Sequence, residues 1–137
     1  MNPIILPLPL ESLTWLTDNA GVHVHLLRGG DDDDTRALLL RVDPGVVIAR
    51  HHHTGEVHAY QLAGTREILG QHFGPGDYTY EPPGNIDSWR VVGDEPVLLF
   101  ITVRGAIEYL DDANNVRRRS TTASITAAFN ALTEAVQ

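Results

Sequence analysis

The residue types best suited to chemistry are clustered, because four of the seven histidines of this 137-residue chain lie within eight positions. They are His51, His52, His53 and His58, and they follow an apolar run at residues 46–49. Side chains i and i+2 of a β-strand project from the same face, so His51 and His53 are expected to point together and His52 to point away. Two imidazoles aimed into a barrel would form half of a mononuclear metal site.

The composition limits the kind of protein this is. A length of 137 residues fits one domain with a core of its own. The formal net charge of −8 disfavours a nucleic-acid partner, which needs a basic face. The chain has no cysteine, which excludes disulfides and thiolate metal sites and suits a cytoplasmic location. No apolar stretch reaches the ~18 residues that a membrane span needs, so no membrane partner is expected.

Short apolar stretches separated by turn signals organise most of the chain. Turns rich in glycine and proline, such as residues 43–45, 74–77 and 81–85, recur at near-regular spacing. Between the turns, strands are expected at residues 22–27, 36–42, 46–53, 58–62, 66–69, 78–80, 88–92, 97–103 and 106–110. This pattern predicts an all-β fold, an antiparallel sandwich or barrel.

The two ends of the chain differ from this central region. Residues 1–20 are apolar and proline-marked at their start, and we interpret them as an extended arm before a barrel at residues 21–112. Residues 113–137 form the expected tail, which ends in an amphipathic α-helix beginning near Ala123. Its apolar face would consist of Ile125, Ala128, Phe129, Leu132 and Val136, and its cap would be Ser120, Thr121 or Thr122. The helix is expected to pack on the barrel or on a partner subunit.

The segment around the histidine cluster has a glycine at each end. Gly45 precedes His51 by five intervening residues, His53 completes the pair, and Gly64 lies beyond it. This spacing resembles the first signature motif of the cupin superfamily, the RmlC-like proteins. The resemblance implies a single cupin jelly-roll barrel with a metal ion inside, and it makes His51 and His53 two of the ligands.

A second segment resembles the second cupin motif. Gly76 is followed after five residues by Pro82, then by Gly84, and after two more residues by Asp87. The superfamily has a histidine at this last position, and its first motif has a glutamate near position 57 or 58, where this chain has no acidic residue. The usual set of three histidines and one glutamate is therefore not carried over whole. His58 could be a fourth ligand if a bulge turns it inward.

Metal chemistry offers an interpretation of the aspartate. Two histidines and one carboxylate on one face of an octahedron form the facial triad of many non-haem Fe(II) oxygenases. His51, His53 and Asp87 could supply this triad for one divalent ion, with Fe(II) favoured and Zn, Ni, Mn or Co also compatible. In the alternative interpretation, Asp87 is a turn residue that binds its own backbone, and His58 lines the pocket or is a hydrogen-bonded core histidine.

Three stretches, at residues 53–64, 76–84 and 105–111, are similar to the 2,4'-dihydroxyacetophenone dioxygenase-like cupins. Characterised members cleave a carbon–carbon bond beside a carbonyl, using O2 and a non-haem iron held by histidines. The resemblance implies a metal-dependent dioxygenase that acts on a small carbonyl or enolate substrate. Two alternatives stay open: a non-catalytic metal- or small-molecule-binding cupin of the sensor type found in anti-sigma factors, and a metal-dependent isomerase or lyase.

A homodimer is expected by analogy, because cupins commonly pair their sheets and exchange N-terminal arms. The apolar stretch at residues 4–10 is compatible with such an arm, and its alternative is to fold back on its own barrel. His23 and His25 form another i, i+2 pair, but no second motif accompanies them, so a solvated strand face is expected. The large aromatic residues Tyr60, Tyr78, Tyr80 and Trp89 are expected in the core or in cross-strand pairs, with one or two lining the pocket.

Overall fold

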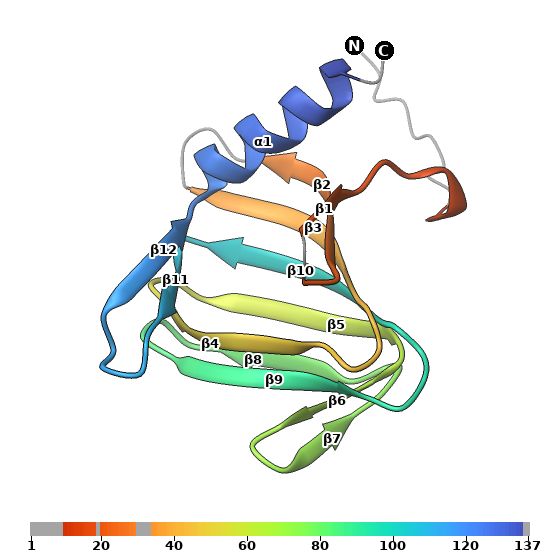
Figure 1. The fold of residues 1–137 in the computed structure, drawn as a ribbon, viewed down its shortest axis with the longest axis vertical. Coiled ribbons are helices and arrows are strands. Elements are labelled where there is room, and N and C mark those ends of the chain that lie inside the picture. The colour runs from red at the N-terminus through yellow and green to blue at the C-terminus, as the bar shows by residue number, and fades with distance from the viewer. Residues whose placement is uncertain (1–9, 19, 30–33, 136–137) are drawn as a thin grey trace.

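The computed structural model describes residues 10–18, 20–29 and 34–135. Within them, two six-stranded antiparallel sheets pack face to face and one α-helix lies across one end of the sandwich (Figure 1). This arrangement confirms the expected all-β jelly-roll class with a C-terminal helix. Most of the apolar part of the expected N-terminal arm, residues 1–9, lies outside the described residues.

The two sheets are named here A and B. Sheet A has the order β1-β2-β3-β10-β5-β8, and sheet B the order β12-β11-β4-β9-β6-β7. The strands of sheet A are β1 (Leu16–Thr17), β2 (Val22–Gly29), β3 (Thr35–Val42), β10 (Val97–Arg104), β5 (Val57–Ala63) and β8 (Tyr78–Glu81). The strands of sheet B are β12 (Val116–Ser120), β11 (Ile107–Leu110), β4 (Val47–His53), β9 (Ile86–Val92), β6 (Thr65–Ile68) and β7 (Gln71–Phe73). Because β4 pairs with β9, the two glycine-punctuated segments meet in sheet B.

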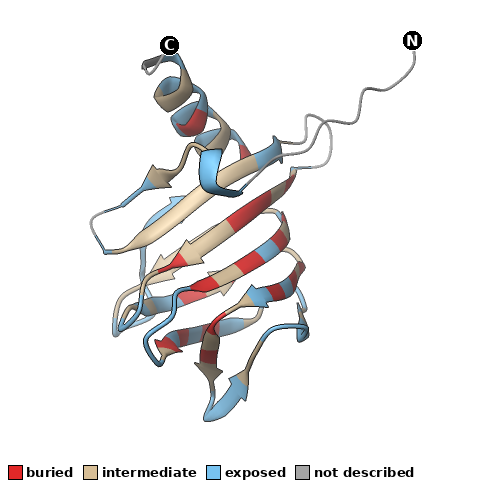
Figure 2. Cartoon of the chain, turned by 90° about the vertical axis from the view of Figure 1, so that its right-hand side faces the viewer, coloured by how far each residue is buried: buried red, intermediate tan, exposed pale blue. Residues whose placement is uncertain are grey.

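The hydrophobic core lies between the inner faces of the sheets. Buried residues alternate with more exposed ones along β10, where the buried set is Val97, Leu99, Ile101 and Val103. The same alternation appears as red bands along several strands in Figure 2. A period of two is what a strand shows when one face packs on the core and the other meets solvent.

The aromatic residues divide between the two faces. Trp89 is buried in the core, as expected. Tyr60, Tyr78 and Tyr80 project from the outer face of sheet A and are exposed, and Tyr60 lies opposite Tyr78 in a cross-strand pair. These tyrosines therefore meet the cross-strand expectation and are not part of the core.

The expected strands are all present, and three short strands were missed. β1 falls within the expected arm, β12 within the expected tail, and β7 pairs with β6 in a hairpin. β1 and β12 are edge strands of sheets A and B, so both ends of the chain add to the sandwich. A short 3-10 helix, η1 (Leu10–Ser12), precedes β1.

The C-terminal helix α1 (Thr122–Ala135) begins where the amphipathic pattern predicts. Thr121 caps it, because the Thr121 hydroxyl accepts a hydrogen bond from the Ser124 amide at 3.1 Å. Phe129 of the helix packs edge-on against the ring of His25, with centroids 5.2 Å apart. His25 is therefore covered by the helix, and the expectation of a solvated face is wrong for this residue. The described helix is too short and insufficiently apolar to cross a bilayer.

Candidate metal centre

Strand β4 presents two histidines to the inner face of sheet B. Ile48 pairs with Trp89 and His51 with Asp87, so β4 has one extra residue between Ile48 and His51. Such a bulge shifts the alternation by one, so Ile48 packs on the core while His51 and His53 are also buried, at 5% and 4% exposure. His52 points away, with Nδ1 3.0 Å from a carboxylate oxygen of Glu108.

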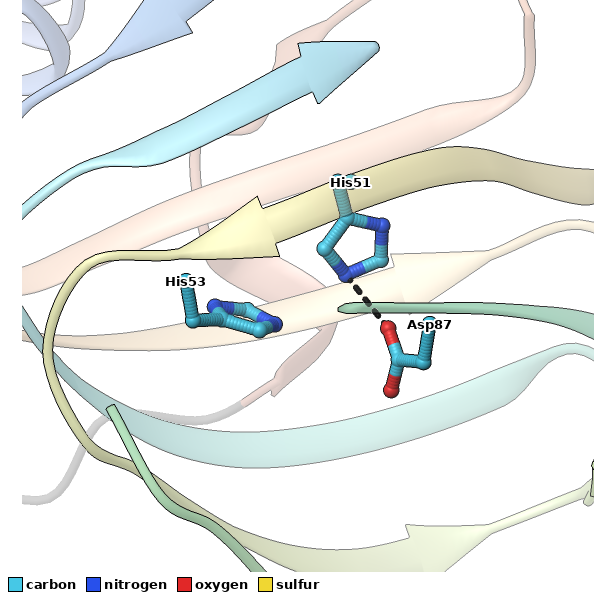
Figure 3. Close-up of side chains that lie close together, drawn as sticks. All are labelled: His51, His53 and Asp87. Carbon is cyan, nitrogen blue, oxygen red and sulfur yellow. Dashed lines mark ion pairs between the residues drawn. The ribbon is translucent and has the colours of Figure 1, made fainter. Parts of the chain in front are cut away.

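Strand β9 places a carboxylate beside these imidazoles. Asp87 is the register partner of His51, and His51 Nε2 lies 2.8 Å from Asp87 Oδ1 (Figure 3). The rings of His51 and His53 are nearly perpendicular, with centroids 4.7 Å apart. One ligand atom from each of the three residues lies within 4.8 Å of the other two, and all three residues are buried. The structure thus brings together His51, His53 and Asp87 from the two segments.

Unsatisfied polar atoms indicate that this group fits a metal ion. Both ring nitrogens of His53 are buried without a hydrogen-bond partner among the described residues, and Asp87 Oδ1 has His51 Nε2 as its neighbour at 2.8 Å. Burial of such atoms is costly unless something compensates them. The Ala49 carbonyl lies 2.7 Å from His51 Nδ1 and can accept its proton, which leaves Nε2 with a lone pair for a metal. Two imidazole nitrogens and one carboxylate oxygen suit a divalent transition-metal ion.

The electrostatics of the metal-free site favour a cation. Burial and the neighbouring His51 lower the pKa of His53 to about 4, so this imidazole is neutral at pH 7. Burial raises the pKa of Asp87, but the contacts with His51 and Glu81 outweigh burial and bring that pKa down to about 2. For His51, burial lowers the pKa, and the contacts with Asp87 and the Ala49 carbonyl outweigh it and raise the pKa. Protonation of His51 therefore competes with metal binding.

Glu81 is a further ionisable group at the site, and the sequence analysis missed it. Its Oε2 lies 3.4 Å from His53 Nε2, and its Oε1 accepts a hydrogen bond from Asn85 Nδ2 at 2.9 Å. Burial and the proximity of Asp87 raise the pKa of Glu81 to about 8. The sequence feature that could have identified Glu81 is the alternation in β8. Its two tyrosines lie on one face, which points outward, so Glu81 faces inward.

The structure does not bring His58 to this group. His58 alternates along β5 with the buried residues Val57 and Ala59, so its side chain lies on the outer face of sheet A. Its Nδ1 is 2.5 Å from the Tyr78 hydroxyl. The register between β5 and β8 is regular around His58, so no bulge in this pair turns the side chain inward.

Two other polar residues face the barrel interior near the site. Arg66 is buried, donates from Nε to Gln61 Oε1 at 3.0 Å and from Nη2 to Thr79 Oγ1 at 2.9 Å, and packs on the Trp89 ring. Its charge acts on both carboxylates of the site. Tyr109 of β11 lies on the other side, with its ring centroid 5.8 Å from that of His51.

Two antiparallel sheets in a jelly roll, with two histidines and an aspartate converging on the inner face of one of them, define the cupin class. Comparison with known families makes the assignment more specific. The chain belongs to the family of the ChrR cupin-like domain, whose model matches residues 8–107. No curated protein sequence matches the chain significantly.

Solved structures of other cupins resemble this one in fold. An RmlC-like cupin from Ralstonia eutropha has a TM-score of 0.85 and 21% identity, over 94% of this chain and 87% of that one. An acetylacetone dioxygenase from Acinetobacter johnsonii has a TM-score of 0.82 and 15% identity, over 96% and 94%. The complex of Rhodobacter sphaeroides SigE with the anti-sigma ChrR gives a TM-score of 0.62 and 23% identity, over 69% of this chain and 51% of that one. At these identities the likeness establishes the fold.

Proposed function

We propose that the chain is a mononuclear metal-dependent dioxygenase that cleaves a carbon–carbon bond next to a carbonyl in a small organic substrate. The observation that carries the proposal is the convergence of the buried residues His51, His53 and Asp87 on the inner face of sheet B, where both ring nitrogens of His53 lack a hydrogen-bond partner among the described residues. The likeness in fold to an acetylacetone dioxygenase over nearly the whole chain supports it.

The residues of the site have distinct parts in this proposal. His51, His53 and Asp87 would hold the ion, with Fe(II) favoured, and would leave coordination positions for substrate and O2. Iron bound there would supply the activation of O2, which amino-acid side chains do not provide. Glu81, whose Oε2 lies 3.4 Å from His53 Nε2, is placed to hydrogen-bond a substrate oxygen or a water beside the ion. The surrounding apolar core would exclude water from the reacting groups.

The test is anaerobic loading with Fe(II), followed by measurement of metal content and of O2 uptake. Acetylacetone and 2,4'-dihydroxyacetophenone represent the small diketones and hydroxyketones to be assayed. We expect one iron per chain and substrate-dependent O2 uptake, both lost in His51→Ala. His52→Ala is the matched control, because His52 points away from the site and should leave both readouts unchanged. Absence of O2 uptake with every metal and substrate would rule out the dioxygenase.

The family match favours a second candidate, a non-catalytic metal-binding cupin of the sensor type. The matched family is named for ChrR, and an anti-sigma ChrR is among the proteins of similar fold. This candidate predicts one tightly bound, coordinatively saturated metal per chain and no O2 uptake. Turnover with Zn or Ni under anaerobic conditions would point to an isomerase or lyase, in which the metal acts as a Lewis acid.

A further inference from the structure

A cavity of 360 Å³ lies at one edge of the sandwich, beside the candidate metal centre. Its lining comes from β1 and β2 of sheet A, from the β11–β12 hairpin of sheet B and from α1, elements whose arrangement Figure 1 shows. Apolar side chains from all of these elements line it, namely Leu16, Val22, Val24, Tyr109, Ile125 and Ala128. Its volume falls near the lower end of the roughly 300–1,000 Å³ that small-molecule sites occupy. The cavity therefore has room for a small organic molecule.

Tyr109 separates this cavity from the proposed metal ligands. Arg118, Tyr109 and His51 are successive register partners across β12, β11 and β4, so they form one row across sheet B. The guanidinium carbon of Arg118 lies 4.3 Å from the centre of the Tyr109 ring, which in turn lies 5.8 Å from the centre of the His51 ring. One aromatic ring thus stands between the cavity wall and the metal centre.

The charged groups that line the cavity are Asp18, Arg118 and Arg119. Asp18 Oδ1 accepts two backbone N–H bonds at 2.9 Å, and Arg119 Nε lies 3.6 Å from Glu108 Oε2. In the described part of the chain, no carboxylate lies within ion-pair distance of Arg118, whose guanidinium rests on the Tyr109 ring. Arg118 is thus a cation at the cavity wall whose charge has no anionic partner there.

We propose that this cavity binds a small organic carboxylate, with the carboxylate on Arg118 and the apolar body against Tyr109, Val22 and Val24. An arginine guanidinium can form two parallel hydrogen bonds with a carboxylate, which gives both affinity and orientation. The inference goes beyond the proposed function, because none of the three proposed metal ligands lines this cavity.

Ligand binding to the metal-free, EDTA-treated protein tests the proposal. The probes are benzoate and phenylpyruvate, paired with their uncharged counterparts benzamide and phenylacetone, and binding is followed by calorimetry and by NMR of the backbone amides. We expect both carboxylates to bind and to shift amides lining the cavity, such as those of Tyr109 and Ser124. The uncharged counterparts should bind at least about 10-fold more weakly, as loss of a charge-assisted bond implies.

Two variants locate the binding. Arg118→Met should weaken carboxylate binding at least about 10-fold, and Ala128→Phe, which fills the cavity from α1, should abolish it. Arg104→Met, which removes an exposed arginine on β10 away from the cavity, should change nothing. The proposal is overturned if neither carboxylate binds at about 10 mM, if the uncharged analogues bind with the same affinity as the carboxylates, or if Arg118→Met leaves carboxylate affinity unchanged. Carboxylate binding without metal uptake would instead contradict the proposed dioxygenase and leave the carboxylate site standing.

Discussion

At the residue scale, Asp87 is the position on which the proposed metal chemistry depends. Asp87→Asn removes the charge of the side chain but keeps its shape. We expect the affinity for Fe(II) or Zn(II) to fall at least about 100-fold, because loss of a residue that only hydrogen-bonds a metal ligand costs about 10- to 100-fold. Asp87→His, which restores the superfamily histidine, should retain most of the affinity. Competition with a chromophoric chelator measures both.

Asp112→Asn provides the matched control for this prediction. Asp112 is exposed in the loop after β11, so its variant should bind metal as the wild type does. An Asp87→Asn protein with unchanged affinity would remove Asp87 from the ligand set and leave it as a buried residue of β9 that pairs with His51.

The raised pKa of Glu81 predicts a pH-dependent stability of the metal-free protein. The folded state holds the Glu81 proton more tightly than the unfolded state, so this group stabilises the fold at low pH. That contribution is lost as the pH rises from 4.5, the ordinary pKa of a glutamate carboxyl, through about 8, the pKa of Glu81 in the folded protein. Urea unfolding of EDTA-treated wild type and Glu81→Gln between about pH 5 and about pH 9 measures the effect.

We expect the free energy of unfolding to fall more steeply with pH in the wild type than in Glu81→Gln. His51 also has a raised pKa and adds a slope of the same sign, whereas the lowered pKa of His53 adds one of opposite sign as the pH rises from about 4 to 6.5. Both histidines are present in each protein, so the difference between the two profiles reports Glu81 and its contacts. Glu134→Gln, on the exposed face of α1, should retain the wild-type slope. Parallel pH profiles for wild type and Glu81→Gln would show that Glu81 ionises normally.

At the scale of elements, strand periodicity and motif spacing predicted the jelly roll and the pair His51 and His53. They could not predict how β4 turns these residues inward. Regular alternation would place His52 on the same face as the core residue Ile48, and the extra residue before His51 reverses this. Nothing in the local sequence marks the bulge, because it depends on how β4 pairs with β9.

The location of Glu81 depends in the same way on tertiary structure. The tyrosines of β8 alternate with Thr79 and Glu81, and aromatic residues usually face a core. Here the tyrosines face outward, where Tyr78 pairs with Tyr60 and Tyr80 with His58 on the exposed face of sheet A. The alternation of residue types assigns the side chains of β8 to two faces, but only the packing of the sheets decides which face lies inside the barrel.

The motif glycines Gly45 and Gly64 should differ in what an alanine costs. Both have positive φ angles, +79° and +77°, so each alanine would cost about 1–2 kcal/mol in backbone conformation alone. A Cβ at Gly45 meets no atom within 4 Å, whereas one at Gly64 would lie 2.3 Å from the Pro96 carbonyl oxygen. We expect Gly64→Ala to lose more than about 3 kcal/mol in urea unfolding and Gly45→Ala about 1–2 kcal/mol. Equal losses would mean that the backbone near Pro96 can shift away from the new Cβ at little cost in free energy.

At the scale of the whole molecule, the two faces of sheet A differ in what covers them. Sheet B packs on the inner face, while the outer face carries Phe100, Tyr60 and Tyr78 as neighbours across β10, β5 and β8. Their exposures are 39%, 46% and 57%, and Leu62 and Tyr80 on the same face are also exposed. Contiguous exposed aromatic residues of this kind mark association surfaces in soluble proteins.

A second copy of the chain is the occupant that we propose for this face, which makes the protein a homodimer. The five exposed residues carry no charge, and the carboxylate at the margin of the face, Glu56, accepts a hydrogen bond from the Tyr80 hydroxyl at 3.4 Å. Size-exclusion chromatography with light scattering should give twice the chain mass of 15.1 kDa. Tyr60→Glu would put two carboxylates into the interface and should give a monomer, whereas Leu69→Glu, at an isolated residue with 89% exposure on the β6–β7 turn, should leave the dimer intact. A monomeric wild type, or a dimer that persists in Tyr60→Glu combined with Tyr78→Glu, would exclude this face as the subunit contact.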